Sequence, residues 1–455
     1  MIITFSVANF RSFASEETLS LVASTRLAGN HDAHAIAIPG SKEQVLKTAV
    51  LYGANGAGKS NLVKALRFLK DVALKQRTKN GATQRQAFRF GQIEQDASSF
   101  DLQFIADGQL FRYGCKLNDQ RILEEWLVRI VRNKEKILYE RITQDDGSVK
   151  IDAPGLKGGK LTALATIGGP QNQSFLATIR ATLDEADWGD QIRAIIDWFD
   201  NRLTLINPDA KFEFLASKLA HDALFLQFAG EFLKSASTGV NGLQVQKKEV
   251  FEDELRQMLP DEVVNHLLQN LPENAEESIL LPLGNGKEIL LEHTDRVHYY
   301  RVSVQASHQE ADGNTKVLDL VDESDGTRRL LDLLPALHDM RNQDAVYVID
   351  EIDRSLHPML VRKFLENFLQ SCDDGQRQII VTTHESSLLD LDLLRRDEIW
   401  FAEKDAAAAS HLYSLADFKV RNDLEIRKHY MQGRFGAVPF LANLERLVSK
   451  EPEAT

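Results

Sequence analysis

The sequence predicts an α/β protein, and three stretches carry that prediction. They are a glycine-rich loop at 53–60, a continuous apolar run at 345–349 and a second strand-like run at 378–383, whose centre is apolar. Such apolar runs are typical of strands that are buried on both faces, as in a parallel sheet. Ligands of these sheets bind beyond the C-terminal ends of the strands. We therefore expect the polar residues that follow these strands to form the functional site.

The glycine-rich loop has the pattern and the context of a phosphate-binding loop. It follows the strand-like run 48–52 and opens into the helix-like stretch 61–66. Its glycines let successive N–H groups point at an anion, and the helix adds its positive N-terminal end. Lys59 is expected to reach the β- and γ-phosphates of ATP, and Ser60 to ligate Mg²⁺. The residues expected to bind the nucleotide here are Gly53, Asn55, Gly56, Ala57, Gly58, Lys59, Ser60 and Asn61.

The two apolar runs end in residues suited to hydrolysis. Asp350 and Glu351 follow the first run, and His384 follows the second. Asp350 is expected to hold Mg²⁺ through water, and Glu351 to polarise the attacking water. His384 is placed to donate a hydrogen bond to the γ-phosphate. We therefore expect Glu351, His384 and Lys59 to be the catalytic residues.

Composition narrows the class of protein. The 455 residues are too many for one ordinary domain and predict two or three lobes. The N-terminal residues read as a strand rather than a leader, and no apolar run reaches membrane-spanning length, so we expect a cytoplasmic protein without a membrane partner. The two cysteines, Cys115 and Cys372, predict neither a disulfide framework nor a metal cluster. A net charge of −13 disfavours general attraction to nucleic acid.

The chain divides into three expected parts. Residues 1–165 form an N-terminal ATPase lobe with the phosphate loop and an antiparallel meander over 100–142. Residues 166–295 form a mainly helical insertion, and residues 296–455 form a C-terminal ATPase lobe.

Two finer expectations follow from the same pass along the chain. Within the insertion, 175–275 reads as helices, and strands return on both sides of a turn at Asn285–Gly286. Near the N-terminus, Arg11 lies in a turn between two strands of the phosphate-loop lobe and is expected near the nucleotide.

A polar turn at 323–327 leads into a further helix-like stretch just before the Asp-Glu strand. With this element between the phosphate loop and His384, the chain resembles the ABC-class ATPases, specifically the SMC- and RecF-like heads. The resemblance implies an ABC-type head with an antiparallel β subdomain. It also implies that Ser324 and Gly326 of one subunit close over the γ-phosphate held by a second copy, so that the nucleotide sites form at a homodimer interface.

Two further features belong to this resemblance. The loop 353–358 matches the loop that crosses the dimer interface in that class, and Asp325 stands where the family has the first of two glycines. Gln171 and Gln173 are the candidates for the family's Mg²⁺-sensing glutamine.

Two segments near the C-terminus make the resemblance more specific. Residues 411–418 and 430–439 look like the tail of single-chain bacterial ATPases related to OLD (overcoming lysogenization defect) proteins, and 9–13 and 324–328 are similar to that group too. Relatives of this group are found in anti-phage and abortive-infection systems beside a separate nuclease-like or toxin subunit. The resemblance implies an ATP-driven homodimer, or a higher oligomer, that controls a separate effector. Because the acids beyond His384 are scattered, we do not expect this chain itself to cut nucleic acid.

Two alternatives stay open at this point. One is a RecF-like DNA-repair ATPase that binds DNA directly, and the other, less favoured, is the nucleotide-binding subunit of a transporter. Basic residues concentrated after the phosphate-loop helix favour the DNA-binding alternative or an acidic partner. These residues are Arg67, Lys70, Lys75, Arg77, Lys79, Arg85 and Arg89.

Overall fold

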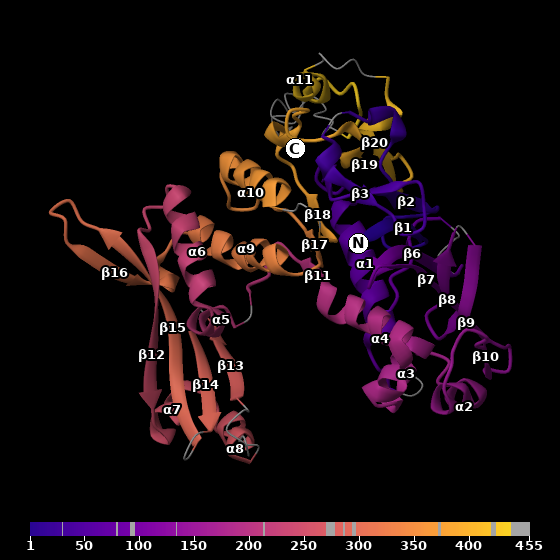
Figure 1. The fold of residues 1–455 in the computed structure, drawn as a ribbon, viewed down its shortest axis with the longest axis horizontal. Coiled ribbons are helices and arrows are strands. Elements are labelled where there is room, and N and C mark those ends of the chain that lie inside the picture. The colour runs from indigo at the N-terminus through magenta and orange to yellow at the C-terminus, as the bar shows by residue number, and fades with distance from the viewer. Residues whose placement is uncertain are drawn as a thin grey trace, which may run out of the picture. The chain divides into compact units, whose positions relative to one another are not determined.

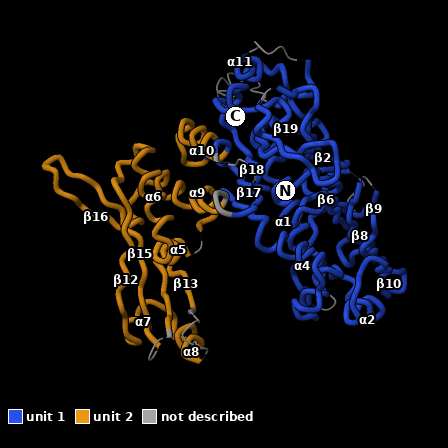
Figure 2. Tube along the Cα trace, viewed as in Figure 1, with its two compact units in different colours: residues 1–208, 343–353, 369–455 blue, residues 209–342, 354–368 orange. Residues whose placement is uncertain are grey.

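The computed structural model describes residues 1–29, 31–78, 81–91, 96–132, 134–212, 214–269, 278–284, 287–293, 297–371, 375–419 and 425–437. The chain forms two compact units, which Figure 2 shows in different colours. Unit 1 comprises 1–208, 343–353 and 369–455, and unit 2 comprises 209–342 and 354–368. The predicted boundaries at 165 and 295 do not coincide with this division, because strands on both sides of 295 pair with each other.

A six-stranded sheet of unit 1 carries the three stretches on which the fold prediction depends. Its strands follow the order β11-β17-β18-β5-β19-β20, and all neighbours are parallel except β19 and β20. The strands are β5 (Thr48–Tyr52), β11 (Leu203–Ile206), β17 (Ala345–Ile349), β18 (Arg377–Thr382), β19 (Ile399–Lys404) and β20 (Ser410–Ser414). Every residue of β5 and β17 is buried, so the prediction of buried parallel strands is confirmed.

A second sheet of unit 1 has seven antiparallel strands in the order β10-β9-β8-β7-β6-β1-β2. They are β1 (Ile2–Ala8), β2 (Glu17–Ser20), β6 (Ser98–Ala106), β7 (Gln109–Leu117), β8 (Ile122–Val131), β9 (Lys134–Thr143) and β10 (Val149–Asp152). The predicted meander over 100–142 is therefore confirmed. A small hairpin of β3 (Ala35–Ala37) and β4 (Gln44–Leu46) pairs separately.

The helices of unit 1 join its two sheets into one apolar core. They are α1 (Lys59–Leu74), α2 (Gly159–Ile167), α3 (Phe175–Thr182), α4 (Gly189–Asp197), a π-helical segment η5 (Trp198–Arg202) and α11 (Ile426–Met431). Helix α1 buries Leu62, Leu66 and Leu69, which recur at helical spacing, and it packs against β1, α3 and η5 (Figure 1). This packing holds the start of α1 beside the C-terminal ends of the parallel strands.

Unit 2 is built on an antiparallel sheet in the order β12-β15-β14-β13, with β16 also paired to β15. The strands are β12 (Gly242–Val250), β13 (Ser278–Gly284), β14 (Lys287–His293), β15 (Val297–Gln309) and β16 (Thr315–Asp319). The helices are α5 (Leu215–His221), α6 (Ala223–Ser235), α7 (Glu252–Met258), α8 (Asp261–Gln269), α9 (Asp325–Asn342) and α10 (Pro358–Ser371), the last of which ends in unit 1. Figure 1 shows the long β15 reaching toward β16.

The two faces of the unit 2 sheet are covered differently. On one face, Ile289 and Leu291 of β14 share an apolar cluster with residues of α7 and α8. On the other, the carboxylate of Glu288 accepts hydrogen bonds from the backbone N–H groups of Ala216 and Ser217, both at 2.9 Å. Because Glu288 and Ile289 are consecutive, they point to opposite faces of the sheet.

The fold corrects one sequence expectation. The stretch 175–275 contains helices α3 to α8, but it also contains β11 and β12, which the helical interpretation missed. In β12, Leu243 and Val245 alternate with polar residues, and they pair with Ala306 and Val304 of β15. Such alternation is typical of a strand with one covered face. Strands β13 and β14 lie where strands were expected, whereas the Asn285–Gly286 turn lies outside the described residues.

Candidate nucleotide-binding site

The phosphate-binding loop connects β5 to α1, as its sequence predicts, and depends on its glycines. Gly53, Gly56 and Gly58 have φ of 155°, 78° and 113°, which residues with a Cβ rarely adopt. A Cβ on Gly53 would collide with the Ala402 carbonyl of β19, and one on Gly58 with the Ser410 side chain of β20. Two strands that lie far along the chain, β19 and β20, therefore pack closely against the loop.

Lys59 lies at the first position of α1 with only 5% of its surface exposed. Its ammonium donates to the carbonyl oxygens of Gly53 (2.6 Å) and Ala54 (3.2 Å), and to Nδ1 of His384 (3.2 Å). Burial lowers the pKa of Lys59 from its ordinary 10.5 to about 8, and the nearby acids Asp353, Glu351 and Asp350 oppose this fall. Lys59 is therefore still mostly charged at neutral pH and points into the loop.

The two acids at the end of β17 are connected to the neighbouring strand by one hydroxyl. Thr382, the last residue of β18, donates through Oγ1 to Oδ1 of Asp350 (2.6 Å) and accepts from the backbone N–H of Glu351 (2.8 Å). Asp350 and Thr382 are buried, with 3% and 1% exposed. Glu351 has a φ of 50°, a strained value for a residue other than glycine. Sequence reasoning missed Thr382. The overlooked signal is its position as a polar residue at the end of a buried strand.

A hydroxyl and a carboxylate meet at the position expected for Mg²⁺. Ser60 Oγ donates to Oδ1 of Asp350 at 3.1 Å. Hard oxygen donors of this kind are those that Mg²⁺ prefers. The residues present therefore fit the ion, and Ser60 and Asp350 are the two that would hold it.

His384 follows β18 and completes this side of the site. Its backbone N–H donates to Oδ2 of Asp353 (3.3 Å), whose Oδ1 is buried and has no hydrogen-bond partner among the described residues. Burial, together with the charge of Lys59, lowers the pKa of His384. Because the Lys59 ammonium can only donate, Nδ1 of the ring is the acceptor. The neutral ring thus carries its proton on Nε2, where it can donate to a ligand.

Lys59, Ser60, Glu351 and His384 line one cavity of about 1220 Å³ in unit 1. Asp350 does not line it but accepts a hydrogen bond from Ser60, which does. The residues that line it are Gly53–Asn61, Glu351, His384, Ser386, Ala402, Glu403, Lys404, Tyr430, Met431 and Ala437. The structure thus brings the predicted loop residues, Glu351 and His384 together. The part of the wall formed by 402–404 and 430–437 was not anticipated, because only the pairing of β19 with β5 places these residues beside the loop.

Other expected site residues take different positions. Arg11 has a φ of 53° and does not line the cavity, and its Nε is buried with no hydrogen-bond partner among the described residues. The next residue, Ser12, accepts from Asn61 of α1 (2.8 Å). Gln173 is used in the interior: its side chain accepts from the Arg77 backbone (2.9 Å) and donates to Thr178 (3.0 Å).

Ser324 and Gly326 belong to unit 2, at the start of α9. Ser324 Oγ accepts from the backbone N–H of Thr327 (3.1 Å), as a helix cap does. A Cβ on Gly326 would lie 2.9 Å from the Ser355 carbonyl, so glycine allows close packing with the loop after Asp353. Ser324, Gly326, Ser355 and His357 line a cavity of about 710 Å³.

Arg67 and Lys70 of the predicted basic segment lie within α1, and the rest follow it. Four of these basic side chains bond within the protein. Arg67 donates to the Leu205 carbonyl (2.7 Å) and Lys70 to that of Leu203 (2.7 Å). Arg77 donates to the Thr83 carbonyl (2.6 Å), and Arg85 forms an ion pair with Asp119 (2.6 Å). These four side chains hydrogen-bond within the fold, whereas Lys75, which pairs with Asp71 (3.0 Å), and Arg89 are exposed. Lys79 lies outside the described residues.

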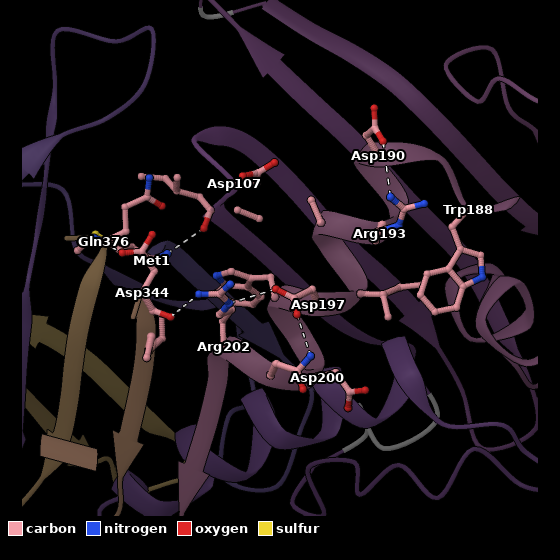
Figure 3. Close-up of a pocket in the computed structure, with 18 of the residues that line it drawn as sticks. Met1, Asp107, Trp188, Asp190, Arg193, Asp197, Asp200, Arg202, Asp344 and Gln376 are labelled. Carbon is pink, nitrogen blue, oxygen red and sulfur yellow. Dashed lines mark hydrogen bonds and ion pairs between the residues drawn. The ribbon is translucent and has the colours of Figure 1, made fainter. Parts of the chain in front are cut away.

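A second cavity of unit 1, of about 510 Å³, lies beside the N-terminal ends of β11, β17 and β18. Figure 3 shows that its charged residues face one another. Arg202 pairs with Asp197 (3.1 Å) and donates to the Asp344 carbonyl (3.1 Å), while Arg180 pairs with Asp200. The lining holds more acids than arginines, which disfavours an anionic ligand, and the phosphate loop lies at the opposite ends of the strands. We therefore assign the nucleotide chemistry to the first cavity.

Comparison with known proteins gives similar structures and a family for the chain. The chain resembles the SMC head domain from Thermotoga maritima (12% identity, TM-score 0.38, covering 91% of this chain and 98% of that one). It also resembles an SMC head bound to the C-terminal winged-helix domain of ScpA (14%, 0.39, 91% and 97%) and one with an extended coiled coil from Pyrococcus furiosus (13%, 0.34, 91% and 96%). No curated protein matches. No described helix is both long and apolar enough to cross a membrane. Residues 49–390 match the family described as "AAA domain, putative AbiEii toxin, Type IV TA system", and the chain therefore belongs to this AAA family.

Proposed function

We propose that this chain binds ATP with Mg²⁺ and hydrolyses it, and that ATP-driven pairing of two copies controls a separate effector. The observation that carries the catalytic part is the convergence of Lys59, Ser60, Asp350, Glu351 and His384 on the cavity of the phosphate loop and its floor. An arrangement of this kind suits phosphoryl transfer, in which the protein positions groups and stabilises charge.

Each residue has a distinct part in the proposed reaction. Lys59 exchanges its loop carbonyl partners for phosphate oxygens, which are stronger acceptors for an ammonium. Glu351 accepts a hydrogen bond from the attacking water, and the neutral His384 donates through Nε2 to the γ-phosphate. Ser60 would ligate Mg²⁺ directly and Asp350 would hold it through water, and the ion would supply positive charge to the phosphate oxygens.

The experiment separates binding from hydrolysis. Glu351→Gln keeps the shape of the side chain and removes the base, so ATP should bind and persist while phosphate release is lost. Lys59→Ala should weaken ATP binding itself. Asp392→Asn, at an exposed acid of the same unit, is the control and should behave as the wild type. Wild-type phosphate release by Glu351→Gln would show that Glu351 is not the base.

The pairing of two copies rests on Ser324 and Gly326. They stand at the start of α9 in unit 2, whereas the phosphate loop belongs to unit 1, and their pattern resembles an element that acts across a dimer. Neither Lys59→Ala nor Ser324→Arg should hydrolyse ATP alone, but a mixture should recover part of the activity because one site of the mixed dimer is intact. No recovery in a mixture proven to contain mixed dimers would count against a shared site.

The control of an effector is the broadest part of the proposal. The description of the family names a toxin and a Type IV TA system, and the resemblance to OLD-related ATPases implies a bacterial defence role beside a partner. A ligand that favours the closed dimer shifts its population and any surface formed only there. Identification of the neighbouring gene product, followed by co-purification with and without ATP, tests this part. Equal recovery of that product in both conditions would contradict ATP control.

A further inference from the structure

The positions of the catalytic groups determine which way a nucleotide lies in the cavity. In the sheet order β17-β18-β5-β19, Glu351 and His384 follow β17 and β18, on one side of the loop that follows β5. A triphosphate with its last phosphate at Glu351 and His384 therefore has its nucleoside directed to the other side of the loop. That side is formed by β19 and the chain beyond it.

The wall on that side is a well-anchored structure. The Tyr413 hydroxyl of β20 lies within hydrogen-bond distance of two acceptors, the Phe435 carbonyl (2.8 Å) and the Glu403 carboxylate (3.0 Å), which share its one proton. The Tyr430 hydroxyl donates to the Ala437 carbonyl (3.1 Å), and its ring stacks with Phe401 of β19 at 5.7 Å between centroids. Segment 430–437 is thus held against β19 and β20, beside the phosphate loop.

One side chain of this wall is unusual. Met431 lines the cavity, yet 61% of its surface is exposed, which is a large exposure for an apolar residue. The buried Tyr430 precedes it, and Lys404 at the end of β19 adds a flexible charged side chain to the same wall. An exposed thioether suits a ligand with a flat aromatic ring system, because sulfur packs favourably on aromatic rings.

We propose that segment 430–437 and the end of β19 form the nucleoside subsite, in which Met431 packs on a purine base. This proposal rests on the proposed function, since it assumes that the phosphate loop binds a nucleoside triphosphate. It assigns the C-terminal segment a direct role in binding, in addition to its packing on the sheet.

The test compares ATP with inorganic tripolyphosphate, which has the phosphates but no nucleoside. Calorimetry should show that Met431→Ala weakens ATP binding by about three- to tenfold, the size of one sulfur–aromatic contact, and leaves tripolyphosphate binding unchanged. Met431→Leu should restore only part of the ATP affinity, because it keeps the apolar packing and lacks the sulfur. Ile167→Ala, at an exposed apolar residue of α2, is the control and should change neither affinity.

The measurements distinguish failure of the nucleoside subsite from failure of the proposed function. Lys59→Ala should weaken both ligands, which establishes that both use the phosphate loop. Unchanged ATP affinity in Met431→Ala, or an equal loss for tripolyphosphate, would overturn the nucleoside subsite while leaving the proposed function standing. Failure of the wild-type protein to bind either ligand would overturn the proposed function itself.

Discussion

Thr382 offers the sharpest test of how the strand-end acids are held. Thr382→Val is nearly isosteric and removes only the hydroxyl that donates to Asp350 and accepts from the Glu351 N–H. A hydrogen bond to a charged group contributes about 1.5–3 kcal/mol, and a buried N–H left without a partner costs about 1–3 kcal/mol. Asp350 keeps its bond from Ser60, and Glu351 is only half-buried, so water can reach its N–H. We therefore expect a loss of about 2–3 kcal/mol in the free energy of unfolding.

Thr382→Val should reduce the rate of ATP turnover more than it reduces the affinity for the nucleotide. Residues that orient a metal ligand typically contribute about 10–100-fold to activity or metal affinity. Steady-state phosphate release by Thr382→Val should fall by about that factor, while ATP affinity measured without Mg²⁺ should stay within about twofold, since Lys59 is untouched.

Thr382→Ser is the matched control, because it keeps the hydroxyl and should restore most of the turnover. Urea unfolding measures the stability term separately at the same temperature. Wild-type turnover in the valine variant, or a serine variant as impaired as the valine one, would refute the reasoning.

Three further predictions concern the phosphate loop and the activity of the whole chain. The pKa of Lys59 near 8 means that its charged form declines as pH rises through that value, so ATP affinity should weaken above pH 8 and stay flat in Lys59→Arg, as measured by titration calorimetry. Gly58→Ala should cost at least about 1–3 kcal/mol of stability and abolish nucleotide binding, because φ is 113° and Ser410 occupies the space; a folded variant with wild-type ATP affinity would contradict this. The purified chain, supplied with ATP, Mg²⁺ and Mn²⁺, should leave DNA and RNA intact on a gel; cleavage that is lost in variants of the acids beyond His384 but survives Lys59→Ala would contradict control of a separate effector.

Much of the site could be predicted because its parts are local. A loop with three glycines, a lysine and a serine encodes its own conformation and its own phosphate contacts. Asp350, Glu351 and His384 were found because continuous apolar runs mark buried parallel strands, and the polar residue after such a run lies at the ligand edge of the sheet. The roles of these residues stay predictions until hydrolysis is measured.

The sequence by itself therefore determined the α/β class, the phosphate loop, the meander and the strand-end acids, because each depends on residues near one another in the chain. Only the tertiary structure decided what surrounds them. Strand pairing joins segments that are distant in sequence, and it places Thr382 beside Asp350 and Ala402 against Gly53. Packing of Tyr430 on Phe401 of β19 likewise brings Met431 beside the loop. The same long-range packing turns Arg67 and Lys70 toward backbone carbonyls, where composition had indicated a basic surface. A local pattern specifies a residue's backbone conformation, whereas its partners depend on which distant segments the apolar core brings together.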